Sequence, residues 1–241
     1  MKKTSKIVAV VLAALLVVAA VAVLAACGEP EHAAYGYVHG NGVAKATVEF
    51  DSEGKIVAAT LDEACVPTQV TAEAEDGEFT VTVGNKIYYK TVKWADVTAV
   101  YDAEANGGKG GYVVGEQLLI NGGAEDSFFA LNAEGAARAK AYFEAVAANK
   151  VTVVTSSGNR TDVMTAEKLL KSKNGYWAQS EKVALGWKGN VEKTIAYVLA
   201  NGVEGTLTKD GTWKDANGVD TGATWTDMLN YFNLFKAAAG K

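Results

Sequence analysis

The amino-acid sequence predicts an α+β fold, built from antiparallel sheet hairpins with several short helices. Segments in which apolar and polar residues alternate occur in neighbouring pairs separated by turn residues, which is the pattern of hairpins. Helical periodicity appears in separate short stretches and not in a regular alternation with strands. Because βαβ units require that alternation, a parallel sheet is not expected.

The clearest hairpin lies near the start of the expected folded part. Residues 43–50 place apolar side chains on one face and polar side chains on the other, as a half-buried strand does. The apolar face consists of Ala44, Ala46, Val48 and Phe50. Residues 51–54 read Asp-Ser-Glu-Gly and predict a turn, so residues 55–61 are expected to return as the partner strand.

Other strands are expected along the chain. Residues 79–83 alternate and continue through a Gly-Asn turn at 84–85 into residues 87–92, which predicts a second hairpin. Residues 151–155 form a β-branched run typical of a strand. Residues 206–214 predict a last hairpin around an Asp-Gly turn.

Four helices are expected from spacing, capping residues and stop signals. They are residues 134–148, residues 165–173 stopped at Asn174-Gly175, a helix capped by Asn190 and ended by Gly202, and residues 227–239 entered through Thr226. With the strands, they divide the chain into a signal peptide at 1–26, a polar tether at 27–34, a mostly β half at 35–150 and an α+β half at 151–241. A boundary is expected near 149–158, and the length fits one domain or two.

The N-terminus has the pattern of a secretory signal peptide. Three lysines precede residues 7–26, which carry no charge, and the stretch closes on Leu-Ala-Ala-Cys at Cys27. This tetrad resembles the bacterial lipobox. The resemblance implies that Cys27 takes a diacylglycerol, that the chain is cut before it, and that membrane lipid anchors the protein at the outer, extracytoplasmic face of the cell membrane. The alternative is an uncleaved transmembrane helix, for which residues 7–26 are long enough.

Composition excludes several classes of function. The formal net charge of −5 becomes −8 once the three signal lysines are removed, so nucleic acid is not an expected partner. With Cys27 on lipid, Cys65 has no partner within the chain, and we expect it to be a small buried residue rather than a reactive thiol. His32 and His39 are the only histidines and lie near the start, so neither a metal cage nor a Ser-His-Asp triad is expected.

A short motif near the C-terminus is the most informative one. Residues 221–224 read Thr-Gly-Ala-Thr, which resembles the Ser/Thr-Gly-Ala-Thr box of FMN-binding domains. Those domains occur in subunits of sodium-pumping quinone oxidoreductases and in lipoproteins of extracellular electron transfer. The strand–Asp-x-x-Gly-Lys-Ile–strand pattern of residues 43–61 resembles the opening of such domains. Family members usually have a valine directly before the box, whereas here Asp220 intervenes after Val219.

The resemblance implies a covalent flavoprotein. A flavin transferase would move FMN from FAD onto Thr224 and form a phosphoester, for which a hydroxyl is required. The transferase must close on that hydroxyl, so the small neighbours Gly222 and Ala223 suit it, and Thr221 completes the box. Gly222 also permits a backbone turn that a Cβ would disfavour.

The surroundings of the box also suit a flavin. The helix entered through Thr226 would direct the positive end of its dipole at a phosphate. Trp225 would cover the apolar face of the isoalloxazine, with Tyr176, Trp177 or Trp187 as more distant candidates. The alternative interpretation is a plain turn followed by a helix cap, since Thr and Gly are common in such places.

A second candidate lies at residues 186–190, which read Gly-Trp-Lys-Gly-Asn. Lys188 and free backbone amides at a helix start could hold an anion there. A tight turn with a packed tryptophan explains the same residues.

Three functions remain open from the sequence. The first is a membrane-tethered flavin electron carrier, a redox carrier and not an enzyme with its own substrate, whose donor and acceptor no motif names. The second is a cofactor-free binding or adhesion lipoprotein. The third is a reductase that uses the flavin on a small external acceptor.

Overall fold

The computed structural model describes residues 32–67, 81–83, 86–154, 161–180 and 183–241 of the chain. The expected signal peptide and Cys27 therefore lie outside the described residues. Helices and antiparallel sheets are mixed in the described part, so the α+β class is confirmed. None of its helices is long and apolar enough to cross a membrane.

The chain begins with three strands and ends with a helix. The elements in order are β1 (His32–His39), β2 (Gly42–Phe50), β3 (Ile56–Cys65), β4 (Val81–Val83), β5 (Lys86–Tyr88), β6 (Thr91–Trp94), β7 (Val97–Asp102), α2 (Ala105–Gly108), β8 (Gly111–Val114), β9 (Gln117–Leu118), α3 (Ala133–Ala147), β10 (Val151–Val154), β11 (Thr161–Met164), α4 (Ala166–Leu169), α5 (Lys171–Asn174), α6 (Gly186–Asn201), β12 (Thr208–Asp210), β13 (Thr212–Lys214) and α7 (Met228–Ala238).

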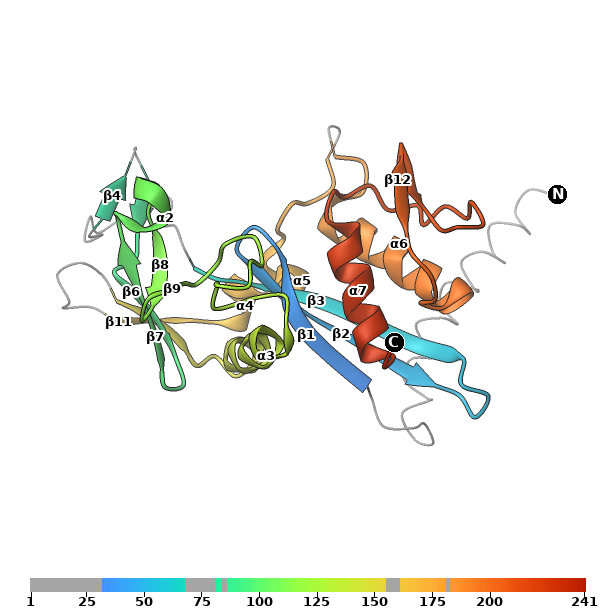
Figure 1. Ribbon diagram of the computed structural model, residues 1–241, viewed down its shortest axis with the longest axis horizontal. Coiled ribbons are helices and arrows are strands. Elements are labelled where there is room, and N and C mark those ends of the chain that lie inside the picture. Colours follow the sequence, from blue (N-terminus) through green and yellow to red (C-terminus); the bar gives the residue numbers. More distant parts are fainter. Residues whose placement is uncertain (1–31, 68–80, 84–85, 155–160, 181–182) are drawn as a thin grey trace, which may run out of the picture.

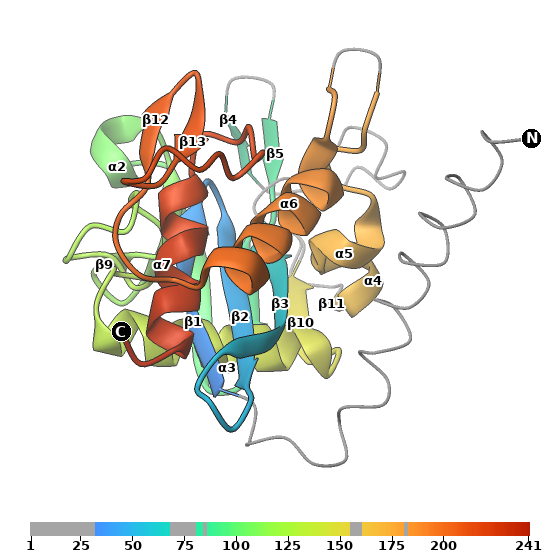
Figure 2. The same ribbon diagram turned by 90° about the vertical axis from the view of Figure 1, so that its right-hand side faces the viewer.

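The antiparallel sheet β1–β2–β3 lies at the centre of the molecule. Helices α6 and α7 cover one face of this sheet, and α3 packs on the other (Figure 2). Successive side chains of a strand point to opposite faces, so one strand serves both cores. In β2, Val43 belongs to the core beside α3, whereas Ala44, Ala46 and Val48 belong to the core beside α6 and α7. The predicted apolar face of residues 43–50 is thus confirmed, but the strand is not half-buried as expected, because Val43 and Thr47 on its other face are buried as well.

A second sheet has six strands in the order β11–β10–β6–β7–β8–β9, with every neighbouring pair antiparallel. It lies at the opposite end of the molecule from α6 and α7 (Figure 1). The strand expected at 151–155 is confirmed as β10, although residue 155 is outside the described part. The expected strand 87–92 is wrong as one element, because it is divided between β5 and β6.

Strand β1 was not anticipated, and residues His32 to Ala34, expected in the tether, are its first residues. Its middle and end are buried by neighbours on both faces. A strand covered on both faces loses the apolar–polar alternation by which a half-buried strand is recognised. The sequence HAAYGYVH accordingly shows no such alternation.

The two buried cores do not follow the expected boundary at 149–158. The core beside α3 takes residues from Tyr37 to Leu170, and the core beside α7 takes residues from Val38 to Ala238. Strand β10 pairs with β6 across that boundary. The central sheet contributes to both cores, so the two expected halves are interleaved.

Three expected helix boundaries are corrected. The segment 165–173 is broken at Leu170, whose extended backbone separates α4 from α5 and bridges to Ala64. Helix α6 begins at Gly186, so Asn190 lies inside it and does not cap it. Helix α7 begins at Met228 with Asp227 at the N-cap position, and Thr226 therefore precedes the cap.

Candidate functional site

The loop from Asp220 to Asp227 connects hairpin β12–β13 to α7 and carries the Thr-Gly-Ala-Thr motif. At its start, the backbone amide of Thr221 donates to the carbonyl of Trp213 over 2.8 Å. The carboxylate of Asp220 accepts from the amide of Gly222 at 2.7 Å and from the hydroxyl of Thr212, also at 2.7 Å. These bonds fix the loop on the hairpin before the motif is reached.

Inside the motif the backbone turns sharply. Gly222 has φ of +70°, in the left-handed region that disfavours residues with a Cβ. Thr221 and Ala223 are buried, and the Thr221 hydroxyl accepts from the amide of Ala223 at 3.2 Å. These two residues support the turn, and neither is among the residues that line the cavity described below.

Asn190 holds the second half of the motif from α6. Its side-chain oxygen accepts from the amides of Thr224 and Trp225, at 2.7 Å and 3.2 Å, and its side-chain nitrogen donates to the carbonyl of Gly186 at 2.7 Å. Asn190 is fully buried. A buried amide with these partners fixes the position of the Thr224 backbone relative to α6.

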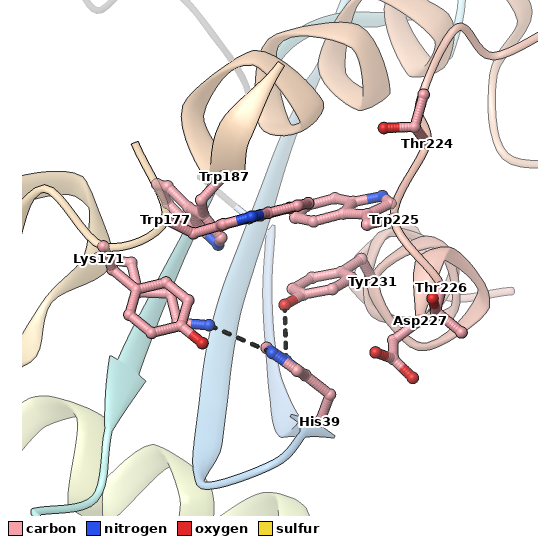
Figure 3. Close-up of a pocket in the computed structure, with 10 residues that line it drawn as sticks. His39, Lys171, Trp177, Trp187, Thr224, Trp225, Thr226, Asp227 and Tyr231 are labelled. Carbon is pink, nitrogen blue, oxygen red and sulfur yellow. Dashed lines mark hydrogen bonds between the residues drawn. The ribbon is translucent and has the colours of Figure 1, made fainter. Parts of the chain in front are cut away.

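The Thr224 side chain is exposed, in contrast to its neighbours Ala223 and Trp225. Its hydroxyl oxygen lies 3.4 Å from the side-chain oxygen of Asn190, a long contact that leaves it accessible. Figure 3 shows Thr224 on the side of the Trp225 ring opposite to Tyr231 and His39. Thr224 therefore combines a fixed backbone with a reachable hydroxyl.

A cavity of about 350 Å³ opens beside Thr224. Strand β1, helices α5, α6 and α7, the loop after α5 and the loop before α7 contribute to it. Its lining residues are His39, Lys171, Tyr176, Trp177, Trp187, Thr224, Trp225, Thr226, Asp227 and Tyr231 (Figure 3). A second cavity of about 600 Å³ shares Lys171, Tyr176, Trp177 and Trp187 with the first. The two spaces are therefore adjacent along one aromatic wall.

The aromatic lining consists of a rigid part and an exposed part. The Trp225 ring stacks on the Tyr231 ring, with centroids 4.0 Å apart and planes 3° apart. Tyr176 and Trp177 are exposed by 45% and 42%. Trp177 has φ of +46°, rare for a bulky residue, and its carbonyl accepts from the amide of Trp187 at 2.9 Å. Strained residues of this kind concentrate at functional sites.

A buried ion pair lies beside the cavity, and one of its members, Lys171, lines it. The ammonium of Lys171 lies 2.6 Å from Oε1 of Glu63, and both side chains are at most 1% exposed. The other carboxylate oxygen, Oε2, accepts from the Tyr231 hydroxyl at 2.5 Å and from the Trp187 indole nitrogen at 3.3 Å. The Lys171 ammonium also lies 4.0 Å from the centroid of the Tyr176 ring. Charges are found this deep in proteins only when they are paired.

His39 connects this ion pair to the open part of the cavity. Its Nδ1 lies 3.0 Å from the Tyr231 hydroxyl oxygen and 3.4 Å from Oε1 of Glu63, and its Nε2 lies 3.4 Å from the Lys171 ammonium. Its side chain is 29% exposed. Burial, the largest cause, lowers the pKa of His39 below its ordinary value, with Glu63 opposing and Lys171 reinforcing that shift.

The structure brings together part of what the sequence analysis singled out. Thr224, Trp225 and Thr226 line the same cavity as Tyr176, Trp177 and Trp187. Lys188 lies at the adjoining cavity and is 87% exposed, 4.0 Å from Glu192.

The sequence analysis missed Glu63, Lys171, His39, Tyr231 and the orienting role of Asn190. His39 lies near the start of the sequence but within the fold, because it is the last residue of β1. The expected partner strand ends at residue 61, so the sequence pattern carries no signal for Glu63, which β3 places on the same face as Leu61.

Cys65 is the free cysteine of the described residues. Burial raises the pKa of its thiol to about 12, so the thiol stays protonated at neutral pH. No group of three or more metal-binding side chains occurs in the described part of the chain.

Comparison of the chain with protein-family models, with curated proteins and with solved structures gives no match.

Proposed function

We propose that this protein is a membrane-anchored extracytoplasmic flavoprotein that carries electrons, with FMN attached through a phosphoester to Thr224. The observation that carries the proposal is the position of Thr224. Its backbone is fixed by Asn190, its side chain is exposed, and it stands at the edge of an aromatic cavity. A transferase needs an accessible hydroxyl, and a bound flavin ring needs an apolar cavity next to the attachment point.

The residues around Thr224 suit the phosphate end of FMN. The methylene carbons of the Lys193 side chain, on α6, run beside Gly222, two positions before Thr224 in the sequence. Helix α7 begins four residues after Thr224 and directs the positive end of its dipole toward this loop. Among the described residues that line the cavity, Asp227 is the one carboxylate and Lys171 is the one lysine. The Asp227 carboxylate, at the N-cap position of α7, would repel a phosphate.

The cavity also suits the ring end. Ligand pockets of small molecules measure roughly 300–1,000 Å³ and are mostly apolar with a few polar groups. The cavity beside Thr224 has about 350 Å³, and the adjoining one adds about 600 Å³ along the shared wall of Tyr176, Trp177 and Trp187. Because Trp225 already stacks on Tyr231, the exposed rings of Tyr176 and Trp177 are better placed to cover a flavin than Trp225 is.

Attachment is a balanced group transfer. The bond from the Thr224 oxygen to phosphorus forms while the pyrophosphate bond of FAD breaks, and AMP leaves with the hydroxyl proton. The bound flavin supplies the electron chemistry, and the protein's own part is to hold the ring and exclude water from one side of it. A covalent link prevents loss of the cofactor outside the cell, and acylation of Cys27 would hold the carrier at the membrane.

The test is mass spectrometry of the full chain produced together with a flavin transferase. The protein should gain the mass of one FMN less one water, and the gain should map to the peptide that contains Thr224. Thr224→Ala should abolish it, and Thr224→Ser should retain part of it because the nucleophile survives. Thr226→Ala is the matched control, since it removes a hydroxyl two residues away and should keep the flavin.

Two outcomes would contradict the proposal in different ways. An unmodified Thr224 peptide in protein from its native membrane would remove the main support and favour the cofactor-free binding lipoprotein. Flavin on a different threonine would leave the function and overturn the site.

A further inference from the structure

The groups around His39 fix where its proton lies. Burial, followed by the charge of Glu63, raises the pKa of Tyr231 well above its ordinary value, so the phenol keeps its proton. That single proton is donated to Glu63, 2.5 Å away. The Tyr231 oxygen can therefore only accept from His39 Nδ1, which lies 3.0 Å away.

Neutral His39 consequently carries its hydrogen on Nδ1 and a lone pair on Nε2. The lone pair faces the ammonium of Lys171 at 3.4 Å. This arrangement satisfies all three groups as long as His39 is neutral. Protonation would put a second N–H on Nε2, directed at an ammonium, so it is opposed by the charge nearest to that nitrogen.

Several titratable or charged groups face His39. They are Glu63 on β3, Lys171 on α5, Tyr231 on α7 and Asp227 at the start of α7. With neutral His39 and Tyr231, one cation stands against two carboxylates, for a net charge of −1. Further negative charge in this cavity is therefore unfavourable unless a proton is taken up, and His39, an imidazole that is 29% exposed, is the member of the cluster best placed to take one up.

We propose that His39 takes up a proton when the cofactor bound in this cavity is reduced, so that electron uptake and proton uptake are coupled at this site. The inference rests on the proposed function and deepens it. Electrons come from a membrane reductant, and the proton comes from bulk water through the open side of the cavity and binds Nε2. No covalent bond of the protein breaks; the contact of Nε2 with Lys171 is lost. Coupling of this kind is reciprocal, so a protonated His39 also favours reduction.

The test is a redox titration of the FMN-loaded full chain in detergent, between about pH 5 and pH 8, where histidines titrate. Two variants remove the titrating group while keeping opposite contacts: His39→Asn keeps a donor in the place of Nδ1, and His39→Gln keeps an acceptor in the place of Nε2. His32→Gln is the matched control, because His32 is the other histidine of the chain and stands exposed at the far end of β1.

One proton per two electrons contributes about 30 mV per pH unit to the midpoint potential. Wild type and His32→Gln should show this additional slope over part of the range, and both His39 variants should lose it. Equal slopes in all four proteins would overturn the coupling. Loss in only one His39 variant would indicate a broken contact instead of a lost proton, and would overturn it too.

A second measurement separates this inference from the proposed function. Nuclear magnetic resonance of flavin-free Thr224→Ala protein should show His39 titrating below the ordinary histidine range. In loaded protein, the His39 signal should titrate at higher pH when the flavin is reduced than when it is oxidised. An unchanged His39 titration in a protein that does carry flavin overturns the coupling alone, whereas a chain that takes no flavin from the transferase overturns both proposals.

Discussion

The two faces of the β1–β2–β3 sheet are both buried, but they are filled differently. On the α3 face, aromatic rings contact one another; they include Trp94, Phe128, Phe129 and Tyr142. On the α6–α7 face, buried polar side chains interrupt the apolar core; they are Glu63, Lys171, Asn190, Thr194 and Thr221. The same three strands thus support one face that is mainly apolar and one that contains a polar network.

The difference indicates how the molecule divides stability and function. Burying apolar rings stabilises the fold directly, whereas burying charges costs free energy that their mutual contacts only partly return. On the α6–α7 face, buried polar residues occur where they hold the Thr224 loop, as Asn190 does, or lie beside its cavity, as Lys171 and Glu63 do. The α3 face, which carries no comparable network among the described residues, supplies a rigid support.

Breaking the buried ion pair is expected to have the largest effect on stability. Lys171→Met leaves the Glu63 carboxylate buried without its cation, which should cost about 3–5 kcal/mol of the free energy of unfolding. Denaturant unfolding measures this loss. The double variant Glu63→Gln/Lys171→Met should recover a large part of it, because no uncompensated charge remains. If the double variant is no more stable than Lys171→Met, the loss comes from packing and not from charge.

A matched variant on the other face sharpens the comparison. Phe129→Ala removes a fully buried ring and should also cost about 3–5 kcal/mol. The two variants should differ in flavin attachment. Phe129→Ala should leave attachment to the folded protein unchanged, whereas Lys171→Met changes a residue that lines the cavity. Reduced attachment in folded Phe129→Ala protein would show that the two faces are not independent.

The sequence predicted the parts of the fold that rest on local pattern. Strand β2 and helix α3 were expected close to their observed bounds, because alternation and helical spacing are read over neighbouring residues. Strand β3 was expected near its observed start, but it continues four residues beyond the predicted end at 61. Strand β1 was missed because cover on both faces removes its alternation. Asn190 was assigned to a cap because Asn favours that place, whereas tertiary contact with the Thr224 loop holds it inside α6.

The candidate site was predictable only where a motif marks it. Thr224 and its neighbours stand together in the sequence, so one short pattern names them. Glu63, Lys171, His39 and Tyr231 come from four different elements, and only the fold brings them to one carboxylate. No local pattern records contacts over such separations in the chain.

Removing the amide that orients the loop should have an intermediate effect. Asn190→Ala leaves the backbone amides of Thr224 and Trp225 without their acceptor, which should cost about 1–3 kcal/mol and reduce the yield of FMN attachment. Unfolding and mass spectrometry measure the two effects. Asn201→Ala is the control: Asn201 also donates to the carbonyl four residues back on α6, but it does not contact the loop. Equal attachment in both variants would show that Asn190 does not position Thr224.

A smaller loss is expected at the turn of the motif. Gly222→Ala forces a Cβ into a backbone with φ of +70°, at a cost of about 1–2 kcal/mol, while the nearest atom of Lys193 lies 3.2 Å from that Cβ at the end of a flexible side chain. Gly211 has the same φ of +70°, and a Cβ added there would meet no atom within 4 Å, so Gly211→Ala should lose similar stability. Only Gly222→Ala should lower FMN attachment; equal attachment in both would argue against a role for this turn.

The smallest effect is expected at Thr226, where sequence and structure give different answers. A threonine that caps a helix contributes about 1 kcal/mol, which is the loss that the sequence predicts for Thr226→Ala. In the structure, Thr226 is exposed and precedes the N-cap position of α7, which Asp227 occupies without a side-chain capping bond. Thr226→Ala should therefore change stability by no more than about 0.5 kcal/mol. Asn132→Ala is the reference, because the Asn132 side chain does cap α3 by accepting from the amide of Gly135 at 2.9 Å, and its loss should cost about 1 kcal/mol. If both variants lose the same stability in denaturant unfolding, Thr226 caps α7 in solution and the helix begins earlier than Met228.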